Sequence, residues 1–137
     1  MMTENVKALI KYRLDQAEES LEAAKILLDK DLIRQCVNRA YYGMFYSVLA
    51  LLAIGKKETS RHSGAISLFD KEFVKEGLFT KEFSRWLHEA FDLRQRSDYA
   101  PSFDLSREQA ERTLQNAVMF VKGVKEVLTR KTNELKP

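Results

Sequence analysis

The longest stretch of the chain without a charged residue runs from Ala40 to Gly55, with the sequence "AYYGMFYSVLALLAIG". A helix made from this stretch is apolar on nearly every side, so neighbouring elements must cover it all round. The stretch is shorter than the roughly 18 to 20 apolar residues that a membrane-spanning helix needs, and three tyrosines interrupt it. We therefore expect a buried central helix in a domain whose other helices pack around it.

Apolar residues before and after this stretch recur at the three- and four-residue spacing of a helix face. In the first segment, about residues 3–30, they are Val6, Ile10, Leu14, Ala17, Leu21, Ala24 and Leu28. The pattern predicts further helices at about 32–54 and 62–75, a fourth capped by Thr80, and a fifth from Ser106 to about Arg130, with residues 131–137 fraying. Only five glycines and two prolines occur in 137 residues, which favours long helices over a loop-rich β architecture. The prediction is a single all-α domain over residues 1–137, an up-and-down bundle of four to five helices.

Composition and the N-terminal sequence indicate where such a domain works. The formal net charge of +3 permits contact with a polyanion without requiring it. The single cysteine, Cys36, cannot form an internal disulfide, and the first residues lack the apolar core and cleavage site of a signal peptide. We expect a cytoplasmic protein that does not contact a membrane.

Metal and cofactor chemistry lacks the residues it needs. Di-iron bundles use a Glu-x-x-His pair on each of two helices, and neither His62 nor His88 has a glutamate three positions before it. The glycines are scattered, so no glycine-rich phosphate loop is present. We expect no metal and no cofactor.

Arg94, in the stretch "LRQRSDYAP", continues the apolar stripe of the fourth helix. The stripe before it consists of Phe83, Leu87 and Ala90. A guanidinium is always charged and needs a partner when it is buried, and Asp98, four residues on, is correctly spaced for an ion pair. In one interpretation this ion pair only stabilises the end of the helix, and Arg96 faces water. In the other it forms an anion pocket, where Arg94 binds a phosphate and Tyr99 supplies a hydroxyl or a stacking face.

Two further segments hold candidate nucleotide or RNA contacts. In "NRAYYGMFY", Tyr42 and Tyr46 share a helix face, and Asn38 and Arg39 give that face a polar edge. An aromatic stripe at helical spacing is more often core packing, so both interpretations stay open. His62 opens the third helix, where free backbone N–H groups could help it bind an anion, although a histidine at a helix start is more often simply exposed.

Three segments taken together, "NRAYYGMFYSVLALL", "RHSGAISLFDKEFVKEG" and "LRQRSDYA", resemble in this order the HEPN family of small all-helical domains. The resemblance covers nearly the whole chain and is closest to the short stand-alone prokaryotic branch. It implies a homodimer. In active HEPN ribonucleases an arginine, four to six intervening residues and a histidine form a signature, and two copies meet at the dimer interface to cleave RNA without metal. Arg94 matches the arginine, but Tyr99 fills the histidine position after four intervening residues.

This departure from the family signature bears on catalysis. A histidine with a pKa of about 6.5 can trade protons with a ribose hydroxyl, whereas a tyrosine with a pKa near about 10 is a poor base at neutral pH. Arg94 could still stabilise phosphorane charge, with Tyr99 as a weak acid. The resemblance also implies pairing with a minimal nucleotidyltransferase as toxin and antitoxin, and in some pairs that partner adenylylates a tyrosine close to the motif. Tyr99 is the candidate for that modification here.

Three functional hypotheses follow. The first is a protein that acts on or binds RNA or a nucleotide, as one member of a toxin–antitoxin-like pair. Its catalytic candidates are Arg94, Asp98 and Tyr99, and its further candidate contacts are Arg96, Arg39, Tyr42 and His62. The second is a non-catalytic helical module that docks a nucleotidyltransferase partner, and the third is a bundle that binds a small ligand at the turn from Tyr41 to Tyr46.

Overall fold

The computed structural model describes residues 3–55, 59, 61–100 and 102–134, and side chains up to residue 131. These residues form helices and connecting turns and include no strand, which confirms the all-α prediction. The elements are α1 (Glu4–Asp29), α2 (Ile33–Ile54), α3 (His62–Phe69), a π-helical turn η1 (Asp70–Val74), α4 (Lys81–Tyr99) and α5 (Arg107–Glu134).

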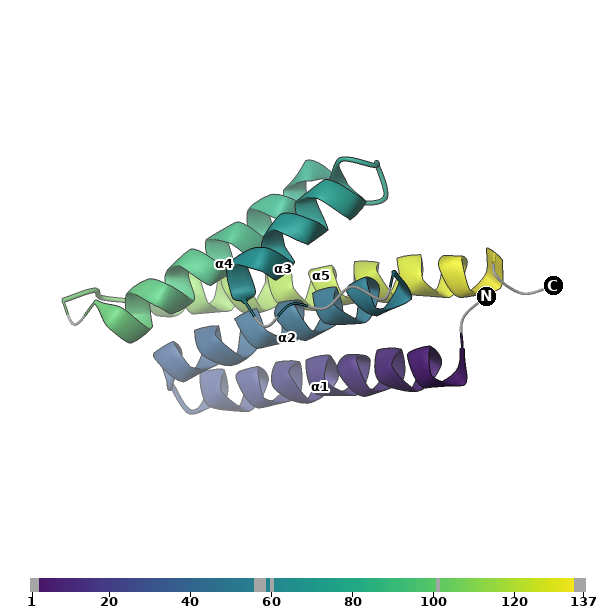
Figure 1. Cartoon of the computed structure of the whole chain (residues 1–137). Helices are drawn as coiled ribbons and strands as arrows, with labels where there is room; N and C mark the ends of the chain where they lie inside the picture. Colours follow the sequence, from purple (N-terminus) through teal and green to yellow (C-terminus); the bar gives the residue numbers. More distant parts are fainter. Residues whose placement is uncertain (1–2, 56–58, 60, 101, 135–137) are drawn as a thin grey trace.

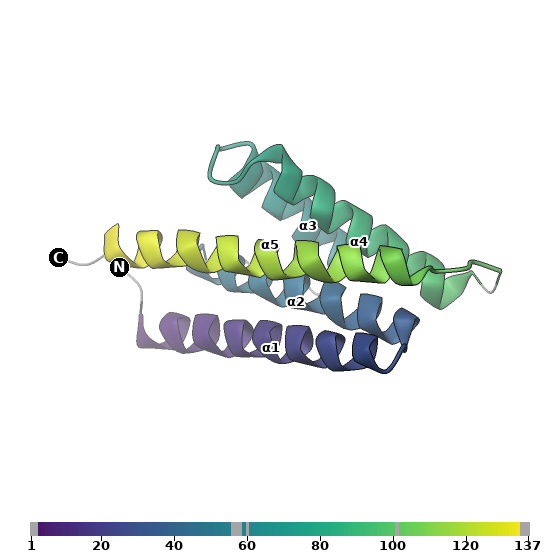
Figure 2. The same cartoon turned by 180° about the vertical axis from the view of Figure 1, so that it is seen from behind.

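The helix α2 lies at the centre of the bundle and contacts α1, α3, α4 and α5. Figures 1 and 2 show α1, α2 and α5 running side by side, while α3 and α4 form an antiparallel pair that crosses them at an angle. The start of α1 and the end of α5 lie at the same end of the molecule. The predicted central helix is therefore confirmed, because α2 is covered from several sides and carries most of its side chains buried.

Local sequence signals explain where several of these helices begin and end. Ser106 and Gln109 form a capping box before α5, since Ser106 Oγ accepts from the Gln109 backbone N–H at 3.1 Å and Gln109 Oε1 accepts from the Ser106 N–H at 2.9 Å. Between η1 and α4, Gly77 has a φ of +84°, a conformation that glycine adopts without steric cost. The bend it allows turns the chain from η1 back into α4.

The structure differs from the predicted helices at two places. The third predicted helix, residues 62–75, is α-helical only to Phe69 and then widens into η1. Asp70, the first residue of η1, accepts a hydrogen bond from Ser84 Oγ at 2.6 Å and lies 2.7 Å from His88 Nε2, so α4 holds the chain where the helix widens. In addition, α5 continues past Arg130 to Glu134, because no glycine or proline stops it. Of the tail expected to fray, residues 135–137 lie outside the described residues.

The aromatic rings of the bundle form two groups. The Phe–Trp cluster consists of Phe69, Phe73, Phe79, Phe83, Trp86 and Phe120. The Tyr–His cluster consists of Tyr41, Tyr42, Phe45, Tyr46, His62 and Phe91. Among the described residues, no helix is long and apolar enough to cross a membrane.

Candidate functional site

The side chain of Arg94, a residue of α4, lies against two tyrosine rings of α2. Its side chain is only 14% exposed. Its Nη2 donates a hydrogen bond to the Tyr42 hydroxyl at 3.3 Å, and its Cζ lies 5.4 Å from the centre of the Tyr42 ring and 5.7 Å from that of Tyr41. Aromatic faces attract a cation at such distances, and more strongly where water is excluded. The predicted apolar stripe of α4 therefore ends in a guanidinium held by aromatic rings.

Asp98 neutralises this guanidinium in part. Its Oδ2 lies 3.3 Å from Arg94 Nε, and the two side chains are spaced four residues apart on α4. Arg94 Nε is buried, yet no acceptor in the described part of the chain meets hydrogen-bond geometry with it. The contact with Asp98 is therefore an attraction between charges, without an aligned hydrogen bond. A guanidinium carries five N–H donors, so Arg94 keeps capacity for a further acceptor such as a phosphate oxygen.

His62, the first residue of α3, joins Arg94 at the same two rings. Its Nδ1 lies 2.7 Å from the Tyr41 hydroxyl. The imidazole stacks on Phe45 with 4.2 Å between ring centres and meets Tyr42 edge to face at 5.5 Å. The sequence suggested His62 and Arg94 as separate candidates, and the fold brings them together.

The surroundings of Tyr41 and His62 indicate how protons are distributed between them. Burial raises the pKa of Tyr41, with Arg94 acting in the opposite direction. Burial, and secondly the Arg94 charge, lowers the pKa of His62. At neutral pH the phenol is therefore protonated and the imidazole uncharged. Because His62 is the only hydrogen-bond partner of the buried Tyr41 hydroxyl among the described residues, the hydroxyl donates to Nδ1 and the imidazole carries its proton on Nε2.

Arg39, which is on α2 like Tyr42, also lies against the Tyr42 ring. Its Cζ is 4.7 Å from the centre of that ring, and its Nε and Nη2 both donate to Asn38 Oδ1, at 3.0 and 2.9 Å. Tyr42 therefore contacts two guanidinium groups, those of Arg39 and Arg94. Two cations near one ring make this face of the molecule attractive to an anion.

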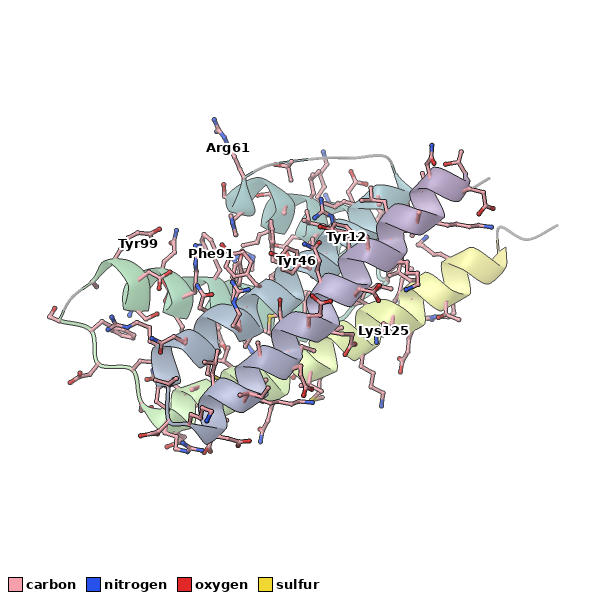
Figure 3. All side chains as sticks on the ribbon, turned by 90° about the horizontal axis from the view of Figure 1, so that it is seen from below. Tyr12, Tyr46, Arg61, Phe91, Tyr99 and Lys125 are labelled. Atoms are coloured by element: carbon pink, nitrogen blue, oxygen red, sulfur yellow. The ribbon has the colours of Figure 1, made fainter. Side chains whose placement is uncertain are left out.

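Arg96 and Tyr99 point elsewhere. Arg96 Nε lies 3.2 Å from Asp92 Oδ2, and its guanidinium approaches the Phe103 ring. Tyr99 is 74% exposed, and Figure 3 shows it beyond Phe91 at the far end of α4. Within the described residues, neither side chain contacts Arg94, so a single chain does not place Tyr99 in the position of a catalytic partner for it.

A cavity of about 350 Å³ opens beside these residues. It is lined by Leu27, Arg34, Gln35, Asn38, Arg39 and Asp98. Sequence reasoning missed Arg34 and Gln35 as site residues. The signal was present, since positions 34, 35, 38 and 39 follow the spacing of one helix face and are all polar. Elsewhere in the described chain, no group of three or more His, Cys, Asp or Glu side chains is placed to hold a metal ion.

Comparison with known proteins identifies the family. The model of the HEPN domain matches residues 10–127. Two proteins of Methanocaldococcus jannaschii, "Putative toxin MJ0142" and "Putative toxin MJ0605", are 35% and 34% identical to this chain over 86% and 93% of it, and over 80% and 95% of their own lengths. A "UPF0332 protein" of Thermotoga maritima is 33% identical over 88% of this chain and 91% of its own length. The resemblance seen in the sequence is confirmed, and the chain belongs to the HEPN domain family.

Proposed function

We propose that this chain is a toxin-like HEPN protein that acts on RNA through the site built by Arg94, His62 and the two tyrosines of α2. The observation that carries the proposal is the meeting of Arg94 and His62, from different helices, on the rings of Tyr41 and Tyr42. The two M. jannaschii relatives carry the name "Putative toxin", which supports a toxin-like role.

The chemistry of these groups suits a phosphodiester. A guanidinium binds phosphate oxygens through directed, charge-assisted hydrogen bonds and stabilises charge that develops on phosphorus. When a ribose 2′-hydroxyl attacks that phosphorus it loses a proton, and the bond from phosphorus to the 5′-oxygen of the next nucleotide breaks as that oxygen takes up a proton from water. An imidazole is the side chain best matched to accept the first proton near neutral pH. In this chain Tyr99 occupies the position of the signature histidine, and His62 supplies an imidazole from α3 instead. In the assigned tautomer Nε2 already carries the ring proton, so Nε2 can accept the ribose proton only after the ring proton has moved from Nε2 to Nδ1 by exchange with water; the Tyr41 hydroxyl then turns and accepts from Nδ1–H.

In the full proposal the chain works as a homodimer and pairs with a minimal nucleotidyltransferase. Both features are carried over from the family resemblance. The exposure of Tyr99 supports its candidacy for adenylylation, because a modifying enzyme needs an accessible hydroxyl. Asp98 then positions Arg94, whereas Arg96, which pairs with Asp92, lies outside this site.

A cleavage assay on total RNA and purified tRNA, with chelator present, tests the proposal. Wild type is compared with Arg94→Ala and with Arg94→Lys, which keeps the charge but loses the two-pronged geometry. Arg85→Ala is the matched control, because Arg85 lies on the same helix, is exposed and pairs with Glu82. We expect cleavage to fall about a hundredfold in Arg94→Ala, to be partly kept in Arg94→Lys and to be unchanged in Arg85→Ala. Equal cleavage by Arg94→Ala and wild type would contradict the assignment.

The exposed Tyr99 and its place in the signature favour a second candidate function, a non-catalytic module that docks a nucleotidyltransferase. If this second function is right, folded wild type should cleave no RNA. A co-expressed nucleotidyltransferase should copurify equally with wild type and with Arg94→Ala, and the complex should be lost in Tyr99→Ala. Loss of RNA binding in Arg94→Ala would favour the first function instead.

A further inference from the structure

The cavity beside Arg94 has the size and the lining of a ligand subsite. It lies between the end of α1, the first half of α2 and the end of α4, which contribute Leu27, four residues of α2 from Arg34 to Arg39, and Asp98. Its volume of about 350 Å³ falls within the range of small-molecule pockets, roughly 300 to 1,000 Å³. One apolar side chain, two guanidiniums, two amides and one carboxylate meet there.

The charges around the cavity favour an anion. Arg34 and Arg39 contact no carboxylate in the part of the chain that the structure describes. Asp98 is the one acidic residue of the lining, and Arg94 already lies against its Oδ2. Two guanidiniums therefore line the cavity, and a third lies behind its one carboxylate. This surplus of positive charge is suited to a phosphate group.

The polar groups at the cavity wall suit the edge of a nucleobase. The carboxylate of Asp98 only accepts hydrogen bonds, and among the described interactions its contact with Arg94 uses Oδ2. Its other oxygen can accept from a donor on the base. Cytosine and adenine each offer an exocyclic amino group, whereas uracil presents a carbonyl oxygen at the corresponding position, which a carboxylate repels.

We propose that this cavity is a nucleotide subsite of the Arg94 site and selects a single-stranded RNA base that carries an exocyclic amino group. The base lies against Leu27 with its amino group toward Asp98, and the amides of Gln35 and Asn38 bond the remaining base edge. The attached phosphate lies between Arg39 and Arg94. This inference rests on the proposed function, because it assumes that Arg94 binds RNA.

Binding of two matched oligonucleotides tests it. Pentacytidylate and pentauridylate differ only on one base edge: cytosine has an amino group at C4 and an unprotonated N3, whereas uracil has a carbonyl at C4 and an N3–H. Methylation of the 2′-oxygens prevents cleavage of both probes. The hydrogen bond from the amino group to the Asp98 carboxylate should make wild type bind the cytidine probe about tenfold more tightly than the uridine probe, a difference of about 1.4 kcal/mol. Fluorescence anisotropy measures both affinities. Asp98→Asn, whose amide can also donate to a carbonyl, should reduce that preference to near unity.

Two variants at exposed Gln35 keep the inference testable if Asp98→Asn fails to fold. Gln35→Phe fills the cavity and should abolish the preference, and Gln35→Ala should weaken cytidine binding. Gln115→Ala is the matched control, since Gln115 is an exposed glutamine of α5 that does not line the cavity. A preference that survives in Gln35→Phe would overturn the assignment of the base to this cavity.

The outcomes also separate this inference from the proposed function. Equal affinity of wild type for both probes, lost in Arg94→Ala, would overturn the base subsite while leaving Arg94 as an RNA contact. Binding of neither probe by wild type would overturn both proposals. A cytidine preference that disappears in Gln35→Phe and Asp98→Asn, and persists in Gln115→Ala, would establish the subsite.

Discussion

The Phe–Trp cluster and the Tyr–His cluster are alike in size but differ in what they contain. In the first, rings pack on rings, with centres 5.2 Å apart for Phe69 and Phe120 and 5.0 Å for Phe83 and Trp86. In the second, a phenol bonds an imidazole and two guanidiniums lie against one ring. Polar and charged groups cost free energy when they leave water, so a cluster needed only for stability has no reason to hold them. From this difference we infer that the first cluster stabilises the fold, and we place the proposed function at the second.

Truncation of Phe120, which is fully buried in the Phe–Trp cluster, should have the largest effect on stability. Phe120→Ala removes ring contacts with Phe69 and Phe83 and leaves a cavity, which costs about 3 to 5 kcal/mol in free energy of unfolding. Urea unfolding followed by circular dichroism measures the loss. A loss below about 1 kcal/mol, the size expected of an ordinary surface change, would show that this cluster is not what holds the bundle together.

Gly123 of α5 sharpens the same point on a smaller scale. A Cβ at this position would lie 2.6 Å from two carbons of the Phe83 ring, which is itself packed against Phe79 and Trp86. Crowding of this kind costs about 1 to 3 kcal/mol, whereas alanine in place of glycine favours a helix by up to about 1 kcal/mol. We expect Gly123→Ala to destabilise wild type but to stabilise the Phe83→Ala variant. The same sign in both backgrounds, in a double-mutant cycle of unfolding free energies, would argue against close packing here.

The Tyr41→Phe change tests the Tyr–His cluster by removing one hydroxyl. The lost hydrogen bond to His62 should cost about 1 kcal/mol in free energy of unfolding. The more specific result is a change of tautomer in His62. In wild type the Tyr41 hydroxyl donates to Nδ1 and so keeps the ring proton on Nε2, and Tyr41→Phe removes that donor. ¹⁵N chemical shifts of the ring should show the Nε2–H tautomer in wild type and a mixture in Tyr41→Phe. A mixture already present in wild type would contradict the assigned proton distribution.

The pH dependence of stability should report the same histidine. Burial lowers the pKa of His62 in the folded state. At a pH just below the usual histidine pKa of about 6.5, the unfolded chain therefore binds more protons than the folded chain does. Stability is therefore full above that pH and falls as the pH drops through the interval between the unfolded and the folded pKa. We expect His62→Gln to show a shallower decline than wild type in chemical unfolding at a series of pH values. Identical slopes would mean that His62 is not desolvated.

Features that depend on neighbours along the chain could be predicted from the sequence. The stripes of apolar residues at three- and four-residue spacing predicted the helices, and the spacing of Arg94 and Asp98 predicted their ion pair. The capping box at Ser106 is local in the same sense. The widening of the third helix at Asp70 was not predicted, because the groups that hold Asp70 there, Ser84 and His88, lie on another helix.

By itself, the sequence determined an all-helical domain with a buried central helix and a guanidinium at the end of an apolar stripe. Tertiary structure alone decided that His62 would meet Tyr41 and share its ring with Arg94. It also decided that the end of α1, the first half of α2 and the end of α4 would line an open cavity. Helical periodicity places residues on a face within one helix. Which faces meet depends on how whole helices cross and on the turns between them, and no spacing along the chain contains that information.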